Sequence, residues 1–356
     1  ARFPGGFRLL RIRPDFRRRL TTMNAASPSS PASAAAGKPP SALKGQLGTY
    51  LGLTVVLLGM IALFGSMSEY FLTRETFISI ANEIPALAVM AVGMTFVLII
   101  AGIDLSVGSV LALSAAVTAA AILEWKLSVP LAAALGLATG LVCGTVTGAV
   151  SVAWRLPSFI VSLGMLEAVR GGAYLVTDSR TQYVGDAISG LAAPWIGGIS
   201  AAFVLAVVLV AVGQLVLTRT VFGRHVVGIG TNEEAVRLAG VDPRPIRIIV
   251  FAVTGLLAGL AGLMQSARLE AADPNAGVGI ELQVIAAVVI GGTSLMGGRG
   301  SVVNTFFGVL IIAVLEAGLA QVGASEPSKR IITGAVIVVA VIIDTLRQRR
   351  ADRRLA

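Results

Sequence analysis

Residues 84–123 read IPALAVMAVGMTFVLIIAGIDLSVGSVLALSAAVTAAAIL, and Asp104 is the one charged residue among them. The two apolar parts, at about 84–101 and 105–123, each approach the roughly 20 residues that a helix needs to cross the hydrocarbon of a bilayer. Neither part has the polar face that a helix on a soluble protein presents at every turn. The stretch therefore predicts two membrane-spanning helices, joined with almost no room for a solvated loop.

The rest of the chain repeats this pattern. Apolar residues make up 55% of it, charged residues 13%, and its mean hydropathy is +0.86, a balance outside that of soluble domains. We expect an all-α, polytopic transmembrane bundle of about ten helices, with broken helices near the glycine-rich motifs. The expected spans lie at about 48–66, 84–101, 105–123, 129–152, 157–177, 192–217, 248–268, 281–297, 302–322 and 329–346.

Lysine and arginine predict the orientation, because short cytoplasmic loops collect them. With both chain ends inside, the cytoplasmic side receives 21 of the 28 basic residues and the outside receives six, with Arg170 inside a span. The expected location is a bacterial inner membrane. Much of the net charge of +9 is then explained by orientation and by contact with membrane lipid headgroups, and nucleic acid is not an expected partner.

Residues 1–47 differ in composition from the rest. An arginine-rich start is followed by a stretch rich in Ala, Ser and Pro, at 25–41, that cannot bury enough apolar surface to fold. We predict a disordered, basic cytoplasmic segment at 1–47, a transmembrane domain at 48–346 and a basic cytoplasmic tail at 347–356. Met23 is one candidate for the native first residue, and a genuine basic tail from residue 1 is the alternative.

The residue counts narrow the chemistry. One cysteine and one histidine argue against a cysteine zinc site and against His-based catalysis, so we expect no metal site and no cofactor. The pattern G-x-x-x-x-G-K-[ST], whose backbone amides cradle phosphates, does not occur in the sequence. The chain is therefore not expected to be an enzyme, and if ATP drives it, a partner subunit binds the ATP.

Two glycine-rich interruptions are the candidate segments for a solute path. The first is GIDLSVGS at 102–109 and the second is GGTSLMGGRGS at 291–301. Such segments break a helix and expose polar groups to a path. In the first segment the polar residues also suit a capped helix start, which is the interpretation that we favour there. The triplet GSV, at 108–110 and 300–302, ends both interruptions and hints at a duplication. Both breaks are predicted on one side, unlike an inverted repeat, so either the duplication is of another kind or one expected span is wrong. The candidate path residues in them are Asp104, Ser106, Ser109, Thr293 and Ser294.

The longest predicted cytoplasmic loop, at 218–247, contains a short capped helix. Thr231 or Asn232 suits its start, two glutamates suit its first turn, and Gly240 suits its end. We interpret the loop as a stiff, charged docking element, and an ordinary solvated loop is the alternative. The candidate docking residues are Gly223, Arg224, Asn232, Glu233, Glu234, Ala235, Arg237 and Gly240.

Three motifs together resemble the permease subunits of bacterial ABC importers for monosaccharides, of the ribose, xylose and galactose type. They are residues 102–109, 223–241 and 285–301, and PSFIV at 157–161 adds to the match. The resemblance implies that two permeases pair, that two ATPase subunits dock beneath them, and that a periplasmic sugar-binding protein delivers the substrate. It also implies that 226–241 is the coupling helix.

Two positions depart from that family. Asn304 stands where the family often has Gly, and Ala317-Gly318 follows Glu316 where the family often has Asn-Gly. If this helix lines the path, Asn304 and Glu316 mark an altered substrate, with ribose the leading expectation. The alternative is that Glu316 faces an interhelical partner or the outer interface.

An ion-coupled secondary transporter of a small polar solute is the rival function. It would also have many spans and broken helices, and it normally needs an ionisable pair inside the bilayer. Glu167 with Arg170, Asp104 and Glu316 are the residues that supply candidates for such a pair.

Overall fold

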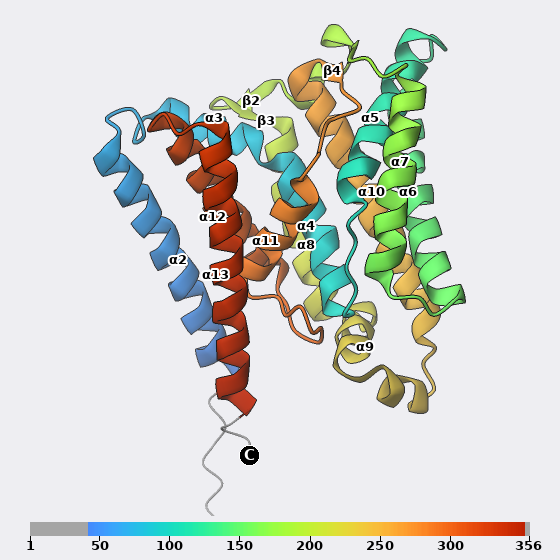
Figure 1. The fold of residues 1–356 in the computed structure, drawn as a ribbon, viewed down its shortest axis with the longest axis vertical. Coiled ribbons are helices and arrows are strands. Elements are labelled where there is room, and N and C mark those ends of the chain that lie inside the picture. The colour runs from blue at the N-terminus through green and yellow to red at the C-terminus, as the bar shows by residue number, and fades with distance from the viewer. Residues whose placement is uncertain (1–41, 353–356) are drawn as a thin grey trace, which may run out of the picture. The chain divides into compact units, whose positions relative to one another are not determined.

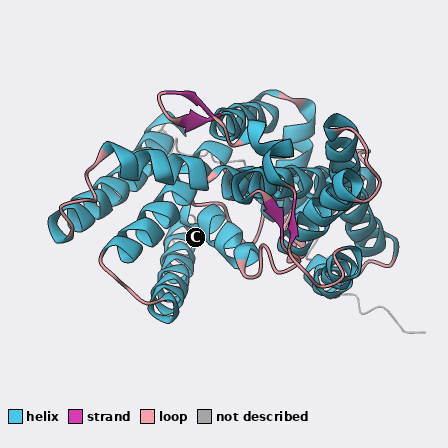
Figure 2. Ribbon diagram, turned by 90° about the horizontal axis from the view of Figure 1, so that it is seen from above, coloured by secondary structure: helices cyan, strands magenta, loops and turns pink. Residues whose placement is uncertain are grey.

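The computed structural model describes residues 42–352 of the chain. Its elements, apart from the first six residues of α2, belong to the compact unit Gly48–Ala356. Figures 1 and 2 show that helices dominate the structure and that strands are short pieces in the connections. The predictions for residues 1–41 and 353–356 lie outside the described residues.

The helices are α2 (Ala42–Met67), α3 (Arg74–Glu83), α4 (Pro85–Ile99), α5 (Val107–Leu123), α6 (Val129–Ala153), α7 (Ser158–Val176), the 3-10 helix η1 (Gly185–Leu191), α8 (Ala201–Arg219), α9 (Val221–Leu238), α10 (Pro243–Leu269), α11 (Ile280–Ile290), α12 (Val302–Gln321) and α13 (Glu326–Asp352). Strand β1 (Gln182–Tyr183) pairs antiparallel with β4 (Ala271–Ala272), and β2 (Pro194–Ile196) pairs antiparallel with β3 (Ile199–Ser200).

The all-α, polytopic fold is confirmed, and each of the ten expected spans overlaps with a helix. By length and composition, six helices within the described residues can cross a membrane, and a seventh crossing is formed if α3 and α4, bent by 48°, count as one. Helix α11 has 11 residues and rises about 17 Å, which is too short to cross the hydrocarbon. Of the ten expected spans, the one at 281–297 is therefore corrected to a helix that does not cross the membrane by itself.

Several helix boundaries differ from the expected ones. The span expected at 281–297 stops at Ile290, because the glycines that follow end the helix and Gly292 has φ +85°. The span expected at 192–217 starts only at Ala201, because the β2–β3 hairpin precedes it. Helix α10 begins at Pro243, before the expected 248, because Asp242 caps it and proline suits the first helical turn.

The predicted loop at 218–247 is largely helical, which corrects its description as a loop. Helix α9 fills most of it, and Asn232, with φ −161° and ψ 97°, divides the helix into two pieces. The Asn232 Oδ1 accepts the Ala235 N–H at 3.0 Å, so the second piece starts with a cap as expected. Gly240 has φ +86° and ends the segment in the left-handed conformation that glycine adopts without strain.

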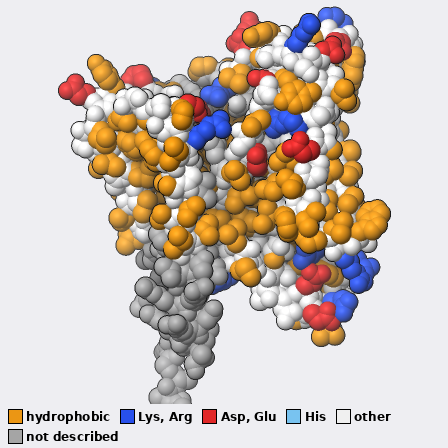
Figure 3. Space-filling model, viewed as in Figure 1, with side chains coloured by type: hydrophobic (Ala, Val, Ile, Leu, Met, Phe, Trp, Pro, Cys, Tyr) orange, Lys and Arg blue, Asp and Glu red, His pale blue; other side chains and the backbone are white. Residues whose placement is uncertain are grey.

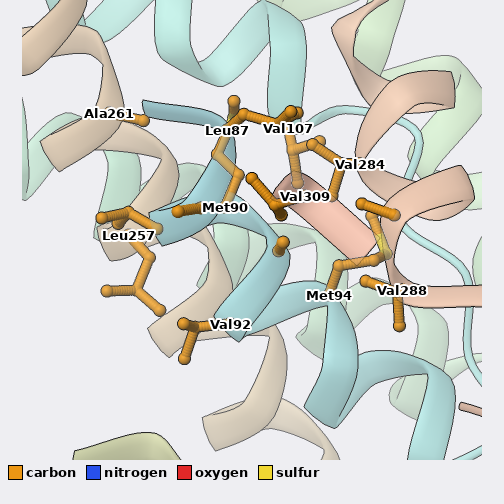
Figure 4. Close-up of a cluster of buried hydrophobic side chains, with 14 of the residues drawn as sticks. Leu87, Met90, Val92, Met94, Val107, Leu257, Ala261, Val284, Val288 and Val309 are labelled. Carbon is orange, nitrogen blue, oxygen red and sulfur yellow. The ribbon is translucent and has the colours of Figure 1, made fainter. Parts of the chain in front are cut away.

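Helix α4 is the centre of the bundle, and each of its residues is buried. It contacts α8, α10, α11 and α12. A helix that is apolar all round is expected in such a place. Side chains from five helices meet in this core (Figure 4), including Leu87, Met90, Val92 and Met94 of α4, Val107 of α5, Leu257 and Ala261 of α10, Val284 and Val288 of α11, and Val309 of α12.

A row of glycines brings α6 and α10 into close contact. Gly136, Gly140, Gly144 and Gly148 recur every four residues and therefore share one face of α6. A Cβ on Gly140 or Gly144 would lie under 3.0 Å from backbone atoms of α10, including those of Gly255. Small residues permit this approach between membrane helices, where packing rather than the hydrophobic effect drives association.

Candidate functional site

Two non-helical segments enter the bundle from opposite ends. Residues 100–106 join α4 to α5, and residues 273–279 join β4 to α11. Figure 1 shows α5 running away from the end that carries α9 and α11 running toward it. The two helix starts meet, because a Cβ on Gly108 would lie under 3.0 Å from the Gly277 carbonyl and the Glu281 carboxylate. The structural counterpart of the first break is therefore 273–279, rather than the 291–301 segment to which the GSV triplet pointed.

Helix α7 supplies hydrogen bonds to the first break. The Ser158 Oγ accepts the Ile103 N–H at 2.9 Å, and the Ser162 Oγ accepts the Leu105 N–H at 3.0 Å. An unpaired backbone group at membrane depth costs several kcal/mol. These two serines, one helical turn apart, thus allow extended chain to lie inside the bundle. Sequence reasoning missed both, although their spacing of four on an apolar helix was a usable signal.

The buried Ser162 hydroxyl gives a prediction about stability. Ser162→Ala leaves the Leu105 N–H without this acceptor, so we expect the free energy of unfolding to fall by about 1–3 kcal/mol. Ser66→Ala is the matched control, because the exposed Ser66 hydroxyl donates to its own helix at Leu63. Thermal unfolding of the two purified variants in one detergent measures the difference, and equal melting temperatures would contradict the role of Ser162.

Asp104 and Ser106 form a closed turn before α5. The Asp104 Oδ1 accepts the Ser106 N–H at 2.9 Å and the Ser106 hydroxyl at 2.6 Å, and both residues are buried. This is an Asx turn directly before the helix, and neither side chain makes a cap hydrogen bond to the first turn of α5. Ser109 lies in the first turn of α5, is also buried, and its hydroxyl has no partner among the described residues.

The 291–301 segment contacts α4 and α9 at one point, which we call the α9 junction (Ile99, Gly230 and Gly298). The Gly298 N–H donates to the Ile99 carbonyl at 2.8 Å. A Cβ on Gly230 of α9 would lie under 3.0 Å from both the Ile99 oxygen and the Gly298 nitrogen. The segment also bonds within itself, because the Ser294 N–H donates to the Arg299 carbonyl at 3.0 Å. The backbones of α9, α4 and this segment are therefore in direct contact at the α9 junction.

Two further candidate path residues, Thr293 and Asn304, lie in or next to the 291–301 segment. Thr293 is buried, and its hydroxyl has no partner within the described part of the chain. The Asn304 N–H donates to Ser301 Oγ at 3.3 Å in the first turn of α12. Gln214 of α8 caps the same helix, since its Oε1 accepts the Val302 N–H at 2.8 Å. Gln214 was not predicted, and as a polar residue late in an apolar span it carried a weak signal.

Glu316 lines two cavities at the end opposite α9. The cavities have volumes of ≈ 440 and ≈ 170 Å³, and Glu83, Gln283 and Glu316 line both of them. The Gln283 Nε2 donates to the Glu316 Oε1 at 2.7 Å. Arg268, which lines the smaller cavity, pairs with Glu83 at 3.7 Å. This set of carboxylates, amide and guanidinium offers both donors and acceptors to a polar solute.

The second break, at 273–279, is also held by α7. The Arg170 Nη1 donates to the Pro274 carbonyl at 2.6 Å and to the Ala276 carbonyl at 2.7 Å. The Tyr174 hydroxyl, one turn further, donates to Asn275 Oδ1 at 2.7 Å. Arg170 thus binds backbone carbonyls, and it forms no ion pair with Glu167 within the described residues. The ionisable pair that the rival ion-coupled mechanism needs is not formed by these two residues.

The polytopic bundle, its two opposed helix breaks and its polar cavity define a multi-pass membrane permease. Residues 76–341 match the family described as branched-chain amino acid transport system, permease component, and the chain belongs to this family of ABC transporter permeases of the inner membrane. As such it is a transport subunit without an ATPase site of its own, and the family implies ATPase and binding-protein partners. This membership replaces the ion-coupled alternative.

Several characterised permeases are similar over most of their length. The ribose import permease protein of Escherichia coli K12 is 39% identical over 300 residues, which cover 83% of this chain and 93% of the relative. The D-allose permease of the same strain is 34% identical, covering 84% and 91%. The L-arabinose permease of Azospirillum brasilense is 34% identical, covering 91% and 96%. No solved structure matches the chain significantly.

Proposed function

We propose that this chain forms the translocation path for a monosaccharide in an ATP-driven importer. The observation that carries the proposal is the pair of adjoining cavities around Glu316 and Gln283. A sugar hydroxyl both donates and accepts hydrogen bonds, and a carboxylate next to an amide serves both needs. The sugar-permease relatives support the same substrate class, and ribose is our first choice because its permease is 39% identical.

We propose further that the α9 end faces the cytoplasm and that α9 docks on the ATPase subunit. The excess of Lys and Arg assigned to that side supports the orientation. On α9, Arg224, Glu234 and Leu238 are exposed, while Gly230 packs against the Ile99 carbonyl of α4. An element with an exposed charged face and a rigid seat passes a partner's motion on, whereas a loose loop would absorb it.

The assembly that we propose contains two permeases, which form either a homodimer or a heterodimer, two ATPase subunits and a sugar-binding protein on the outer side. Charged side chains lie within the apolar surface in Figure 3, between α13 and α7. Charges at membrane depth are costly against lipid. The position of these charged side chains therefore supports the interpretation that this surface faces the path between the two permeases and does not face lipid.

The test is uptake into proteoliposomes that contain the permease, its ATPase and its binding protein. Ribose, allose and arabinose are supplied as labelled substrates, each with ATP inside. We expect Glu316→Ala to reduce uptake of the preferred sugar roughly tenfold or more, because hydrogen bonds to a charged group are worth about 1.5–3 kcal/mol. Glu124→Gln, at the exposed end of α5, is the control and should keep the parental rate.

Two outcomes would contradict the proposal at different levels. If the parental complex takes up none of a broad panel of monosaccharides while importing a branched-chain amino acid, the substrate class is wrong. If it imports a sugar and Glu316→Ala retains both the rate and the order of preference among sugars, the path lies elsewhere than the cavities around Glu316.

A further inference from the structure

A third cavity opens at the α9 end, with a volume of ≈ 600 Å³. It lies between the turn that joins α6 to α7, the end of α9 and the start of α10. Its charged lining comprises four basic and two acidic residues, namely Arg155, Arg237, Arg244, Arg247, Glu233 and Asp242. Figure 3 shows Lys and Arg side chains gathered with acidic ones below the apolar surface in this part of the molecule.

The acidic groups satisfy only part of this positive charge. Arg247 pairs with Glu233. Arg237 pairs at 2.7 Å with Glu234, a residue that does not line the cavity. The Asp242 Oδ1 accepts the backbone N–H of Arg244 at 3.0 Å as a helix cap. Within the described residues, Arg155 and Arg244 form no ion pair.

The guanidinium of Arg247 adds a further unmet donor. Its Nε is buried and has no hydrogen-bond partner within the described residues, although its terminal Nη2 holds Glu233. A guanidinium fork suits the oxygens of a phosphate group, to which it donates parallel hydrogen bonds. The cavity therefore has the chemistry of a phosphate site, with donors from Arg155, Arg244 and Arg247.

The surroundings of the cavity favour a lipid over a free anion. The α6–α7 turn places Trp154, 69% exposed, and Leu156, 44% exposed, on either side of Arg155. Tryptophan is enriched where membrane helices meet the headgroup level. Basic pockets between helices on the cytoplasmic side are suited to anionic headgroups. A lipid phosphate among the arginines would leave its acyl chains beside this apolar surface.

We propose that this cavity binds the phosphate-bearing headgroup of an anionic phospholipid from the cytoplasmic leaflet. The site takes its orientation from the proposed function but does not depend on the transported substrate. Glu233, Arg237 and Gly240, which line the cavity, belong to the second piece of α9 and its end. A bound headgroup joins this piece to the start of α10, so the lipid also braces the element that docks on the ATPase.

The experiment measures lipid retention by native mass spectrometry. The full chain is delipidated and then reconstituted in nanodiscs of either phosphatidylglycerol or phosphatidylcholine, and it is released into detergent before measurement. We expect the parental chain to retain phosphatidylglycerol preferentially. The double variant Arg155→Ala with Arg244→Ala should lose this preference by roughly thirtyfold, because each basic group near an anionic membrane contributes about a factor of five.

Two further variants separate the site from general charge and from folding. Arg219→Ala removes an exposed arginine at the end of α8, outside the cavity lining, and should keep the parental retention. Arg155→Lys with Arg244→Lys keeps the charge but loses the guanidinium fork, so its preference should lie between those of the parental chain and the alanine variant. Melting temperatures measured in parallel identify any variant that has lost its fold, and the lysine variant then carries the comparison.

Four results would overturn the proposal. The first is equal retention by the alanine variant and the parental chain, and the second is an equal loss in Arg219→Ala. The third is displacement of the lipid by soluble glycerol phosphate at a similar concentration, which would make the site one for free anions. The fourth is loss of ATPase association by the alanine variant in pure phosphatidylcholine, which would assign the arginines to an acidic surface on the ATPase.

Discussion

Gly230→Ala is expected to reduce ATP-driven uptake at least tenfold while ATP hydrolysis by the associated ATPase continues. The added Cβ would lie under 3.0 Å from the Ile99 carbonyl oxygen and the Gly298 nitrogen, both of them backbone atoms. Helix α9 must then move away from α4, since backbone in a packed bundle cannot yield as the end of a side chain can. Uptake and phosphate release measured in the same proteoliposomes give the ratio of sugar transported to ATP hydrolysed.

Gly228→Ala is the matched control on the same helix. Its Cβ would meet only the Cγ2 atom of Val236, at 3.1 Å, and that methyl group can move by a few tenths of an ångström. We expect this variant to transport at close to the parental rate. If Gly230→Ala and Gly228→Ala behave alike, the α9 junction does not transmit the motion of the ATPase.

Gly144→Leu is expected to prevent the bundle from forming. A side chain there would overlap the Phe251 carbonyl and the backbone of Gly255, so α6 and α10 must separate along their shared glycine face. Overpacking lowers the free energy of unfolding by about 1–3 kcal/mol when neighbouring side chains can move. Because the contacts here are with backbone atoms, we expect a loss of about 3 kcal/mol or more. Size-exclusion chromatography of a fluorescent fusion measures the fraction of folded protein.

Gly164→Leu on α7 is the comparison for this variant. No heavy atom would lie within 4 Å of its Cβ, and Gly164 is exposed, so the fusion should elute as the parental protein does. A monodisperse Gly144→Leu protein with a parental melting temperature would show that the glycine face is not what holds α6 against α10.

The features that the sequence predicted well are local. The long apolar runs predicted the helices, because crossing a bilayer imposes a length and a polarity that composition reveals directly. The second piece of α9 was predicted with its cap at Thr231 or Asn232 and its end at Gly240, and the structure places the cap at Asn232. Both signals lie within a few residues of the structure that they specify.

The features that the sequence did not predict depend on contacts between residues that are far apart in the chain. Ser162 contacts residue 105, and Arg170 contacts residues 274 and 276, so their roles exist only once α7 lies beside both breaks. The counterpart of the 102–109 break was misplaced for the same reason. The short motif in the 291–301 segment looked similar, whereas 273–279 shares geometry with the first break and not its sequence.

The type of a residue predicted its role in the candidate site less well than its position in the folded structure did. Asp104 and Ser106 are polar residues in an apolar stretch, which suggested a path, yet their groups bond to one another in the turn before α5. Glu316 was the candidate with the least support from motifs, and it lines the cavities. A motif that folding requires and a motif that binds a solute use the same small polar residues, so sequence alone does not separate them.

From the contacts at the α9 junction we expect α9 and the 291–301 segment to move as one body when the ATPase acts. Electron-electron double resonance measures it most directly, with spin labels at Leu238, which is 80% exposed, and Met296, which is 77% exposed. Cys143 is first replaced by alanine, and a second pair joins Leu238 to Trp125, just beyond the end of α5. We expect one unchanged Leu238–Met296 distance through the nucleotide cycle, together with a shift in the Leu238–Trp125 distance. A Leu238–Met296 distance that changes on ATP binding while the Leu238–Trp125 distance stays fixed would contradict it.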